Sequence, residues 1–200
     1  ILADKGYTTA MINLSNVYKE KKDFGNMELY LRAAADKGNL DAMYNLGNWY
    51  GKSGLFSKAE AYLKTASENG HLKATYNLAL LYSRAGLKYY SQSEKYFKLA
   101  SEKGLIEATN NLGILYKNKK KYAEAEKYLK NALEMLIQKP DYKSDTENLE
   151  GLINDNLGDL YKEMKKYDES EKYYKQAIKT KFKKAEEDLQ DLYKLMKNKK

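Results

Sequence analysis

The sequence predicts an all-α protein, folded as a right-handed superhelical solenoid of antiparallel helix hairpins. Two observations lead to this prediction. One signature recurs along the chain, as NLSNVY at 13–18, NLGNWY at 45–50, NLALLY at 77–82, NLGILY at 111–116 and NLGDLY at 156–161. In addition, a single Pro in 200 residues and abundant Leu, Lys, Glu and Ala favour helices throughout.

The spacing of the signature indicates stacked repeats. Its Leu falls at 14, 46, 78, 112 and 157, with intervals of 32, 32, 34 and 45 residues, and such periods are typical of repeat architectures. The signature predicts a first helix, because Ala42, Leu46 and Tyr50 share one helical face. A second helix follows and ends at ENG 68–70 or EKG 102–104, where Gly suits the left-handed residue that closes a helix.

We expect residues 1–200 to form a single solenoid. ILADKGYTTA aligns with AAADKGNLDA at 33–42, so residues 1–7 are expected to end a preceding repeat, and the chain to be a piece of a longer protein. Five repeats follow at 8–39, 40–71, 72–105, 106–150 and 151–182. Residues 183–200 are expected to form a C-terminal capping helix with a polar outer face.

The fourth repeat is extended. Pro140 predicts that its second helix ends near Gln138 and that a loop follows. The next helix is expected to start near Asp145 or Thr146.

Three glycines stand in the middle of predicted first helices: Gly47, Gly113 and Gly158. Gly costs about 0.5 to 1 kcal/mol relative to Ala at such positions. Because the cost recurs, and because the other two copies carry Ser15 and Ala79, we expect the second helix to approach the first closely here.

Two further residue types recur. Equivalent tyrosines in the second helices are expected to pack between repeats: Tyr62, Tyr96, Tyr128 and Tyr173. The signature amides are expected to form hydrogen-bonding struts between neighbouring repeats, with a secondary role in binding left open: Asn13, Asn45, Asn77, Asn111 and Asn156.

Residues for catalysis or metal binding are scarce. The chain has no Cys, which excludes disulfides, thiolate nucleophiles and zinc fingers. The lone His71 is expected in a solvent-exposed turn and cannot build a multi-His metal site. The carboxylate pairs Glu102 with Glu107 and Glu186 with Glu187 are expected on solvated helix faces, without the burial that acid–base catalysis requires.

Two motif-like stretches also fail. GKS at 51–53 lacks the Gly that a phosphate loop requires at position 46. Residues 141–152 lack the Gly and the bidentate Glu of a calcium loop and are expected to be a linker. We therefore predict that the protein is not an enzyme and binds no cofactor or metal, and no apolar stretch of about 18 residues predicts a membrane span.

The pattern L-G-x-x-Y followed by A-x-x-x-[FL]-x-x-A resembles the tetratricopeptide repeat (TPR), and the junctions AAADKGNLDA and ASENGHLKA resemble those of its Sel1-like relatives. The resemblance implies a non-catalytic scaffold whose concave groove binds a protein or peptide. The family's carboxylate-clamp variants, which hold C-terminal peptides of chaperones, are matched only in part, by Asn16, Asn45 and Lys73. At the positions where these variants carry basic residues, this chain has Ile12 and Asn77.

In this repeat class the groove is expected to be lined at fixed offsets from the signature Leu. Tyr44 and Tyr76 are candidate apolar anchors, unless both merely pack against the neighbouring first helix. The predicted binding residues are Ile12, Asn16, Tyr44, Asn48, Lys73, Tyr76, Leu80, Asn110, Ile114, Asp155 and Asp159.

The net charge of +8 raises the alternative of a weak nucleic-acid or anionic-surface binder. The expected groove is nearly neutral, however, which favours a protein or peptide partner. A regulatory or assembly segment of a larger protein is the other alternative, and the sequence indicates neither compartment nor oligomeric state. The groove charges are Lys19, Lys52, Lys73, Arg84, Lys117 and Lys162 against Glu20, Asp41, Glu107, Asp155, Asp159 and Glu163.

Overall fold

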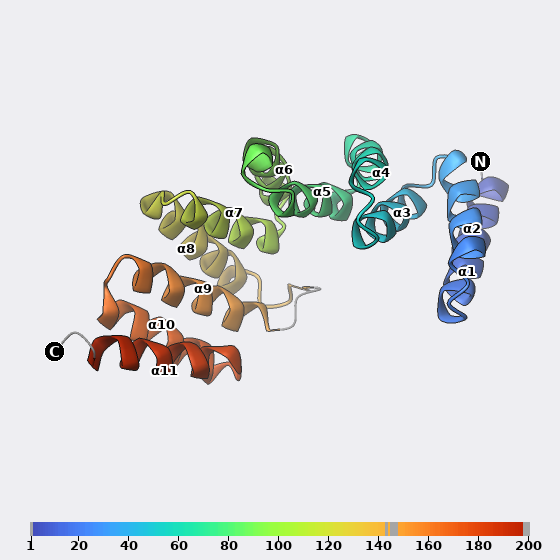
Figure 1. The fold of residues 1–200 in the computed structure, drawn as a ribbon. Helices are drawn as coiled ribbons and strands as arrows, with labels where there is room; N and C mark the ends of the chain where they lie inside the picture. Colours follow the sequence, from blue (N-terminus) through green and yellow to red (C-terminus); the bar gives the residue numbers. More distant parts are fainter. Residues whose placement is uncertain (1, 143, 145–147, 198–200) are drawn as a thin grey trace. The chain divides into compact units, whose positions relative to one another are not determined.

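The computed structural model describes residues 2–142, 144 and 148–197, and every regular element in these ranges is helical (Figure 1). The predicted all-α repeat solenoid is confirmed. None of the helices in these ranges combines the length and apolar composition that a membrane span requires. The elements are α1 (Leu2–Glu20), α2 (Phe24–Asp36), α3 (Leu40–Lys52), α4 (Phe56–Glu68), α5 (Leu72–Arg84), the short 3₁₀ helix η1 (Leu87–Tyr89), α6 (Tyr90–Glu102), α7 (Ile106–Asn118), α8 (Tyr122–Gln138), α9 (Leu149–Glu163), α10 (Tyr167–Lys179) and α11 (Lys184–Lys197).

The chain divides into two compact units, residues 1–99 and 100–200. In unit 1, α1 packs on α2, α2 on α3, α3 on α4 and α4 on α5. In unit 2 the same succession runs from α7 to α11. Each signature therefore lies on a first helix that pairs with the second helix after it. Residues 2–7, expected to end a preceding repeat, instead form the beginning of α1.

Glycines in left-handed conformation close the second helices at the predicted places. Gly38, Gly70 and Gly104 have φ of 81°, 89° and 86°. A side-chain acceptor then caps the next helix in several repeats, as where Asn39 Oδ1 accepts from the backbone N–H of Ala42 at 3.0 Å. The junctions between repeats are thus set by local chemistry.

The predicted close approach of the two helices in a repeat is confirmed. A Cβ placed on Gly113 would lie 2.5 Å from Leu129 Cγ, and one on Gly47 the same distance from Leu63 Cγ. At Gly158 the neighbour is the ring of Tyr174, and Ser170 Oγ of α10 donates to the Gly158 carbonyl at 2.8 Å. The absent Cβ leaves the room that the large second-helix side chain occupies.

Tyrosine rings stack within each repeat: the second-helix tyrosines, which were expected to pack between repeats, make these ring contacts inside their own hairpin. The signature Tyr lies face to face with the Tyr of the second helix in its own hairpin. Ring centroids are 5.4 Å apart for Tyr18–Tyr30, 5.7 Å for Tyr50–Tyr62, 5.8 Å for Tyr82–Tyr96, 5.2 Å for Tyr116–Tyr128 and 5.4 Å for Tyr161–Tyr173.

The hydroxyl of the signature Tyr makes the contact between repeats. It donates to a Glu on the second helix of the preceding repeat: Tyr50 to Glu28 at 2.6 Å, Tyr82 to Glu60 at 2.5 Å, and Tyr161 to Glu126 at 2.8 Å. Burial, together with the Glu126 hydrogen bond and against the effect of Lys130, raises the pKa of Tyr161 to about 12. The phenol therefore stays protonated and donates at neutral pH.

Tyr142 and Ser144, which follow α8 in the chain, contact the start of α7. The α8 helix ends at Gln138, as predicted from Pro140, whereas the predicted helix start at Asp145 or Thr146 lies outside the described residues. Tyr142 Oη and Ser144 Oγ both donate to the Glu107 carboxylate at 2.5 Å. Glu107 is only 4% exposed, so the expectation of a solvated Glu107 is wrong: Tyr142 and Ser144 occupy both of its oxygens.

The last helix, α11, covers α10. Leu192 and Ala185 are fully buried against Tyr174 and Ala177. Tyr193 Oη donates to Glu171 of α10 at 2.7 Å, the contact that a signature Tyr makes elsewhere. The face away from α10 carries exposed polar residues, including Glu186, Glu187, Gln190, Asp191 and Lys194.

Replacing Gly113 with Ala or Leu is expected to destabilise the protein because the new side chain must displace Leu129. The Leu variant should lose about 1 to 3 kcal/mol or more of unfolding free energy in urea titrations. Gly6→Ala is the matched control: Gly6 lies in α1, where an added Cβ would meet no atom within 4 Å, and this change should gain up to about 1 kcal/mol. Equal effects at the two positions would refute the close-approach account.

Deleting residues 183–200 is expected to expose Tyr174 and Ile178, lower the unfolding free energy by at least about 2 kcal/mol and promote self-association. Urea titration and size-exclusion chromatography measure the two effects. Leu192→Ala should reproduce much of the loss, whereas Leu195→Ala, at a 38% exposed residue, should change little. An equally stable monomer after truncation would show that α11 is not a cap.

Candidate functional site

Two adjoining hollows border the first helices of unit 1; we call them together the unit 1 groove. The larger, about 490 Å³, lies along α3 and α5, and the smaller, about 160 Å³, lies along α1 and α3. Asn48 and Lys52 line both, so the two hollows adjoin at these residues. The larger is lined by Tyr44, Gly47, Asn48, Gly51, Lys52, Gly54, Phe56, Leu63, Asn77, Leu80, Leu81, Arg84 and Ala85, and the smaller by Ser15, Asn16, Lys19, Met27, Leu31, Asn45, Asn48, Trp49 and Lys52.

The groove combines amides and apolar side chains. Asn77 Nδ2 of α5 donates to Asn48 Oδ1 of α3 at 2.6 Å, which confirms the predicted strut at this junction. Leu80 and Leu81 add aliphatic surface, and all four are partly exposed. The predicted residues Asn16, Tyr44, Asn48 and Leu80 therefore line these two adjoining hollows: Asn16 lines the smaller, Tyr44 and Leu80 the larger, and Asn48 both.

Tyr44, Ile12 and Lys73 also border a broader hollow of about 680 Å³ at the edge of the groove, beside His71. The His71 ring stacks on Tyr44 with centroids 4.9 Å apart, and its Nε2 lies 3.1 Å from Asp41 Oδ1. His71 Nδ1 accepts from the backbone N–H of Ala74 at 3.0 Å and caps α5. The exposed-turn expectation for His71 is wrong, because these contacts leave its side chain 15% exposed.

Tyr76 differs from Tyr44 although the two occupy equivalent positions. Its ring lies 5.9 Å from that of Phe97, on the second helix of its own repeat, and it lines neither hollow of the groove. The packing alternative thus applies to Tyr76, with its own second helix as the neighbour, while Tyr44 remains at the groove.

In unit 2 most of the predicted residues are buried or paired with other residues of the same unit. Asn110 and Asp155 are 2% and 1% exposed. Asn156 Nδ2 donates to Asn110 Oδ1 at 3.0 Å, a second strut between first helices, whereas Asn111 donates to the Glu107 carbonyl of its own helix. Ile114 is partly buried. Burial removes Asn110 and Asp155 from a surface that a partner can reach.

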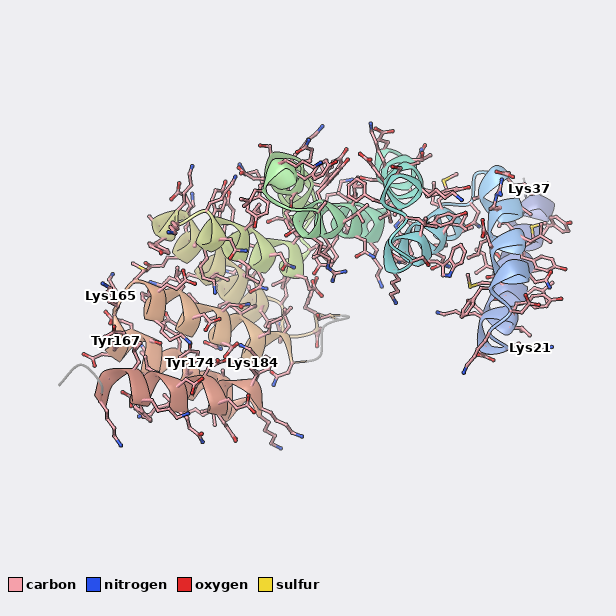
Figure 2. The ribbon with its side chains drawn as sticks, in the orientation of Figure 1. Lys21, Lys37, Lys165, Tyr167, Tyr174 and Lys184 are labelled. Atoms are coloured by element: carbon pink, nitrogen blue, oxygen red, sulfur yellow. The ribbon has the colours of Figure 1, made fainter. Side chains whose placement is uncertain are left out.

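Carboxylates and lysines form a network between α9, α10 and α11, near Tyr174 and Lys184 (Figure 2). Lys184 Nζ lies 2.8 Å from Asp155 Oδ2 and 2.7 Å from Asp188 Oδ2. Tyr174 Oη donates to Asp159 Oδ1 at 2.7 Å. Asp155 Oδ1 is buried and accepts no hydrogen bond from any described residue.

Burial raises the pKa of Asp155 to about 6, against the opposing effect of Lys184. Partial burial lowers the pKa of Lys184, but its hydrogen bonds to Asp155 and Asp188 outweigh this and raise it overall. Lys184 therefore stays cationic at neutral pH. The network has a structural role, since it joins α11 to α9.

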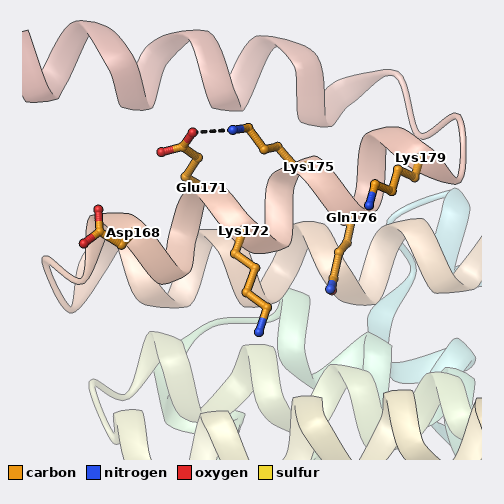
Figure 3. Close-up of a pocket in the computed structure, with 6 residues that line it drawn as sticks. All are labelled: Asp168, Glu171, Lys172, Lys175, Gln176 and Lys179. Carbon is orange, nitrogen blue, oxygen red and sulfur yellow. Dashed lines mark ion pairs between the residues drawn. The ribbon is translucent and has the colours of Figure 1, made fainter.

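The outer face of α10 has a further shallow hollow, of about 460 Å³ (Figure 3). All of its lining residues come from this one helix, and two of them, Glu171 and Lys175, form an ion pair at 2.5 Å.

GKS at 51–53 lies at the C-terminal end of α3, where helix carbonyls rather than N–H groups are free. This geometry gives no anion-binding loop.

Because the folded pKa of Asp155 exceeds its unfolded value, its contribution favours folding at low pH and is lost as pH rises through about 6. Asp155→Asn should therefore be at least as stable as the wild type at pH 7.5. Lowering the pH to 4.5 should shift the difference toward the wild type by about 2 kcal/mol. Urea titrations at both pH values measure this. Asp191→Asn, at an exposed residue, is the control, and a difference for Asp155→Asn that ignores pH would contradict the assignment.

Comparisons with known proteins agree with this architecture. Residues 104–181 match a family model described as Tetratricopeptide repeat, and residues 40–68 match a second model of the same description, together more than half of the chain. Comparison with curated proteins gives no match. The resemblance to Sel1-like relatives stays a prediction.

Solved structures share the fold at low identity. A tetratricopeptide repeat protein from Parabacteroides merdae is 22% identical with a TM-score of 0.72, over 94% of this chain and 73% of that one. Pseudomonas aeruginosa pilF is 18% identical with a TM-score of 0.71, over 89% and 78%. A thermophilic TPR protein from Thermus thermophilus is 19% identical with a TM-score of 0.65, over 93% and 98%. With the family models, these likenesses lead to one conclusion: the chain belongs to the tetratricopeptide repeat family.

Proposed function

We propose that the protein is a non-catalytic scaffold that binds a segment of a partner protein in the unit 1 groove. The observation that carries this proposal is that the two hollows adjoin at Asn48 and Lys52, which line both. A depression that follows three successive first helices suits a chain segment better than a compact small molecule.

The groove offers the mixture of groups that peptide recognition uses. Leu80 and Leu81 can cover an apolar side chain in the larger hollow, where Asn48 and Asn77 add amide groups, and Asn16 and Asn45 present amides in the adjoining smaller hollow. A few polar groups on an apolar surface fix orientation, and burial of one large side chain supplies much of the binding energy.

The corresponding surface of unit 2 is less suited to this role. Asn110 and Asp155 are buried, and the partly exposed Asp159 accepts from Tyr174 and lies 3.4 Å from Lys117. A partner would have to break these contacts before it could bind. Unit 1 is therefore the proposed binding half.

Peptide binding is compatible with service as a regulatory or assembly segment of a larger protein, because such a segment also works by holding a partner. Nucleic-acid binding is the competing function. It predicts a steep fall of affinity for an arbitrary oligonucleotide with rising salt, and a salt titration separates it from peptide binding.

A library of random 16-residue peptides, displayed on phage and selected on the protein, tests the proposal. Selected peptides should bind at least tenfold more weakly to the double variant Tyr44→Ala with Leu80→Ala, which corresponds to about 1.4 kcal/mol or more. The matched control is Tyr7→Ala with Leu29→Ala, at residues 54% and 60% exposed outside the groove.

Melting curves identify any loss caused by unfolding, and the single Leu80→Ala variant preserves the Tyr44–His71 stack if the double variant is unstable. Equal affinity for the wild type and the groove variants would overturn the proposal.

A further inference from the structure

A cation occupies the last turn of the first helix in every repeat: Lys19, Lys52, Arg84, Lys117 and Lys162. Interaction with the helix dipole favours a positive charge at this place. This local effect accounts for the recurrence of the cations, but it does not determine which residues they contact.

In unit 2 these cations are neutralised by residues of the same unit. Lys117 Nζ lies 3.4 Å from Asp159 Oδ2 and 3.8 Å from Glu163 Oε1. Lys162 Nζ lies 3.4 Å from Asp159 Oδ1. A single carboxylate, two residues after the signature Leu of α9, thus serves both lysines.

Unit 1 lacks that carboxylate. The position of Asp159, two residues after the signature Leu, is held by Asn16 in α1, Asn48 in α3 and Leu80 in α5. Consistent with this, the structure gives Lys19, Lys52 and Arg84 no ion pair within the described residues, and all three are exposed.

The charged residues that line the groove are correspondingly all cationic. Lys19 and Lys52 line the smaller hollow, Lys52 and Arg84 line the larger, and no Asp or Glu among the described residues lines either. Of the two acidic residues expected at this surface, Glu20 lies outside both linings, and so does Asp41, which borders the broader hollow at the edge of the groove with its Oδ1 3.1 Å from His71 Nε2.

We propose that the unit 1 groove selects an acidic peptide segment, whose carboxylates meet Lys19, Lys52 and Arg84 while a large apolar side chain packs against Leu80 and Leu81. This inference rests on the proposed function and adds the chemical class of the partner. Ionised pairs form stronger hydrogen bonds than neutral groups do, and Arg84 can hold a carboxylate through two N–H donors.

The same residues favour peptide over nucleic acid. The cations sit beside aliphatic side chains, and the one Trp of the groove, Trp49, lies with its ring centroid 4.9 Å from that of Tyr50. That arrangement gives no row of open aromatic faces for successive bases to stack on.

The peptide selection described above tests the inference through composition and charge reversal. Peptides selected on the wild type should be enriched in Asp and Glu, and should bind at least tenfold more weakly to Lys52→Glu and to Arg84→Glu. Lys52→Gln, which removes the charge without adding repulsion, should show a smaller loss. Lys64→Glu is the matched control, because Lys64 is an exposed lysine of unit 1 on α4, outside the groove.

The outcomes separate the two proposals. Peptides that depend on Tyr44 and Leu80 but are not acidic, or that ignore both charge reversals, overturn the acidic-partner inference and leave groove binding standing. Peptides that ignore the groove variants overturn both. If a 20-nucleotide single strand binds the wild type more tightly than any selected peptide does, and binds the Lys52→Glu variant more weakly, the choice of a peptide partner is overturned.

Discussion

The close approach of two helices within a repeat is the constraint on which the rest of the structure depends. At Gly47, Gly113 and Gly158 the space of a missing Cβ is taken by a large side chain from the second helix. That contact fixes the spacing and register of the hairpin. With the register fixed, the signature Tyr meets the second-helix Tyr face to face, and its hydroxyl points to the Glu of the preceding repeat. One steric contact therefore supports both the hairpin and the stacking of hairpins.

Side chains that do not take part in this close contact between the two helices of a repeat are free to differ between units. Their differences give the two units different surfaces. The position two residues after the signature Leu is the clearest case. It is Asn16, Asn48 and Leu80 in unit 1 but Asp159 in α9, where the carboxylate neutralises Lys117 and Lys162. The same last-turn lysine is thus an internal partner in unit 2 and an exposed charge in unit 1. A carboxylate of the same protein pairs with the lysine without the entropy loss of binding a separate molecule. The lysines of unit 2 are therefore paired within the protein.

Features that repeat were predictable from the sequence, because a residue type that recurs at the same place in every repeat indicates a structural requirement of the helix pair rather than chance. The helix pairs, the glycine closures at Gly70 and Gly104, and the close contacts at Gly47 and Gly113 all follow from periodic positions. The contact between Tyr and Glu was equally periodic, since Glu28, Glu60, Glu94, Glu126 and Glu171 each stand two residues before a second-helix Tyr. Periodicity alone did not indicate it, because single carboxylates among lysines are typical of a solvated helix face.

Features set by one non-repeated segment were not predictable in this way. Glu107 is buried and accepts hydrogen bonds from Tyr142 and Ser144, more than thirty residues later in the chain. Asp155 is buried beside Lys184 of the last helix. His71 is covered because it replaces the Asn that caps α3 at the equivalent place, and its larger ring reaches Tyr44 and Asp41. A groove residue therefore has to be judged by what its neighbours in space leave uncovered. By that measure the offsets from the signature Leu point to an open surface in unit 1, while in unit 2 the same offsets point to side chains that the protein itself has paired.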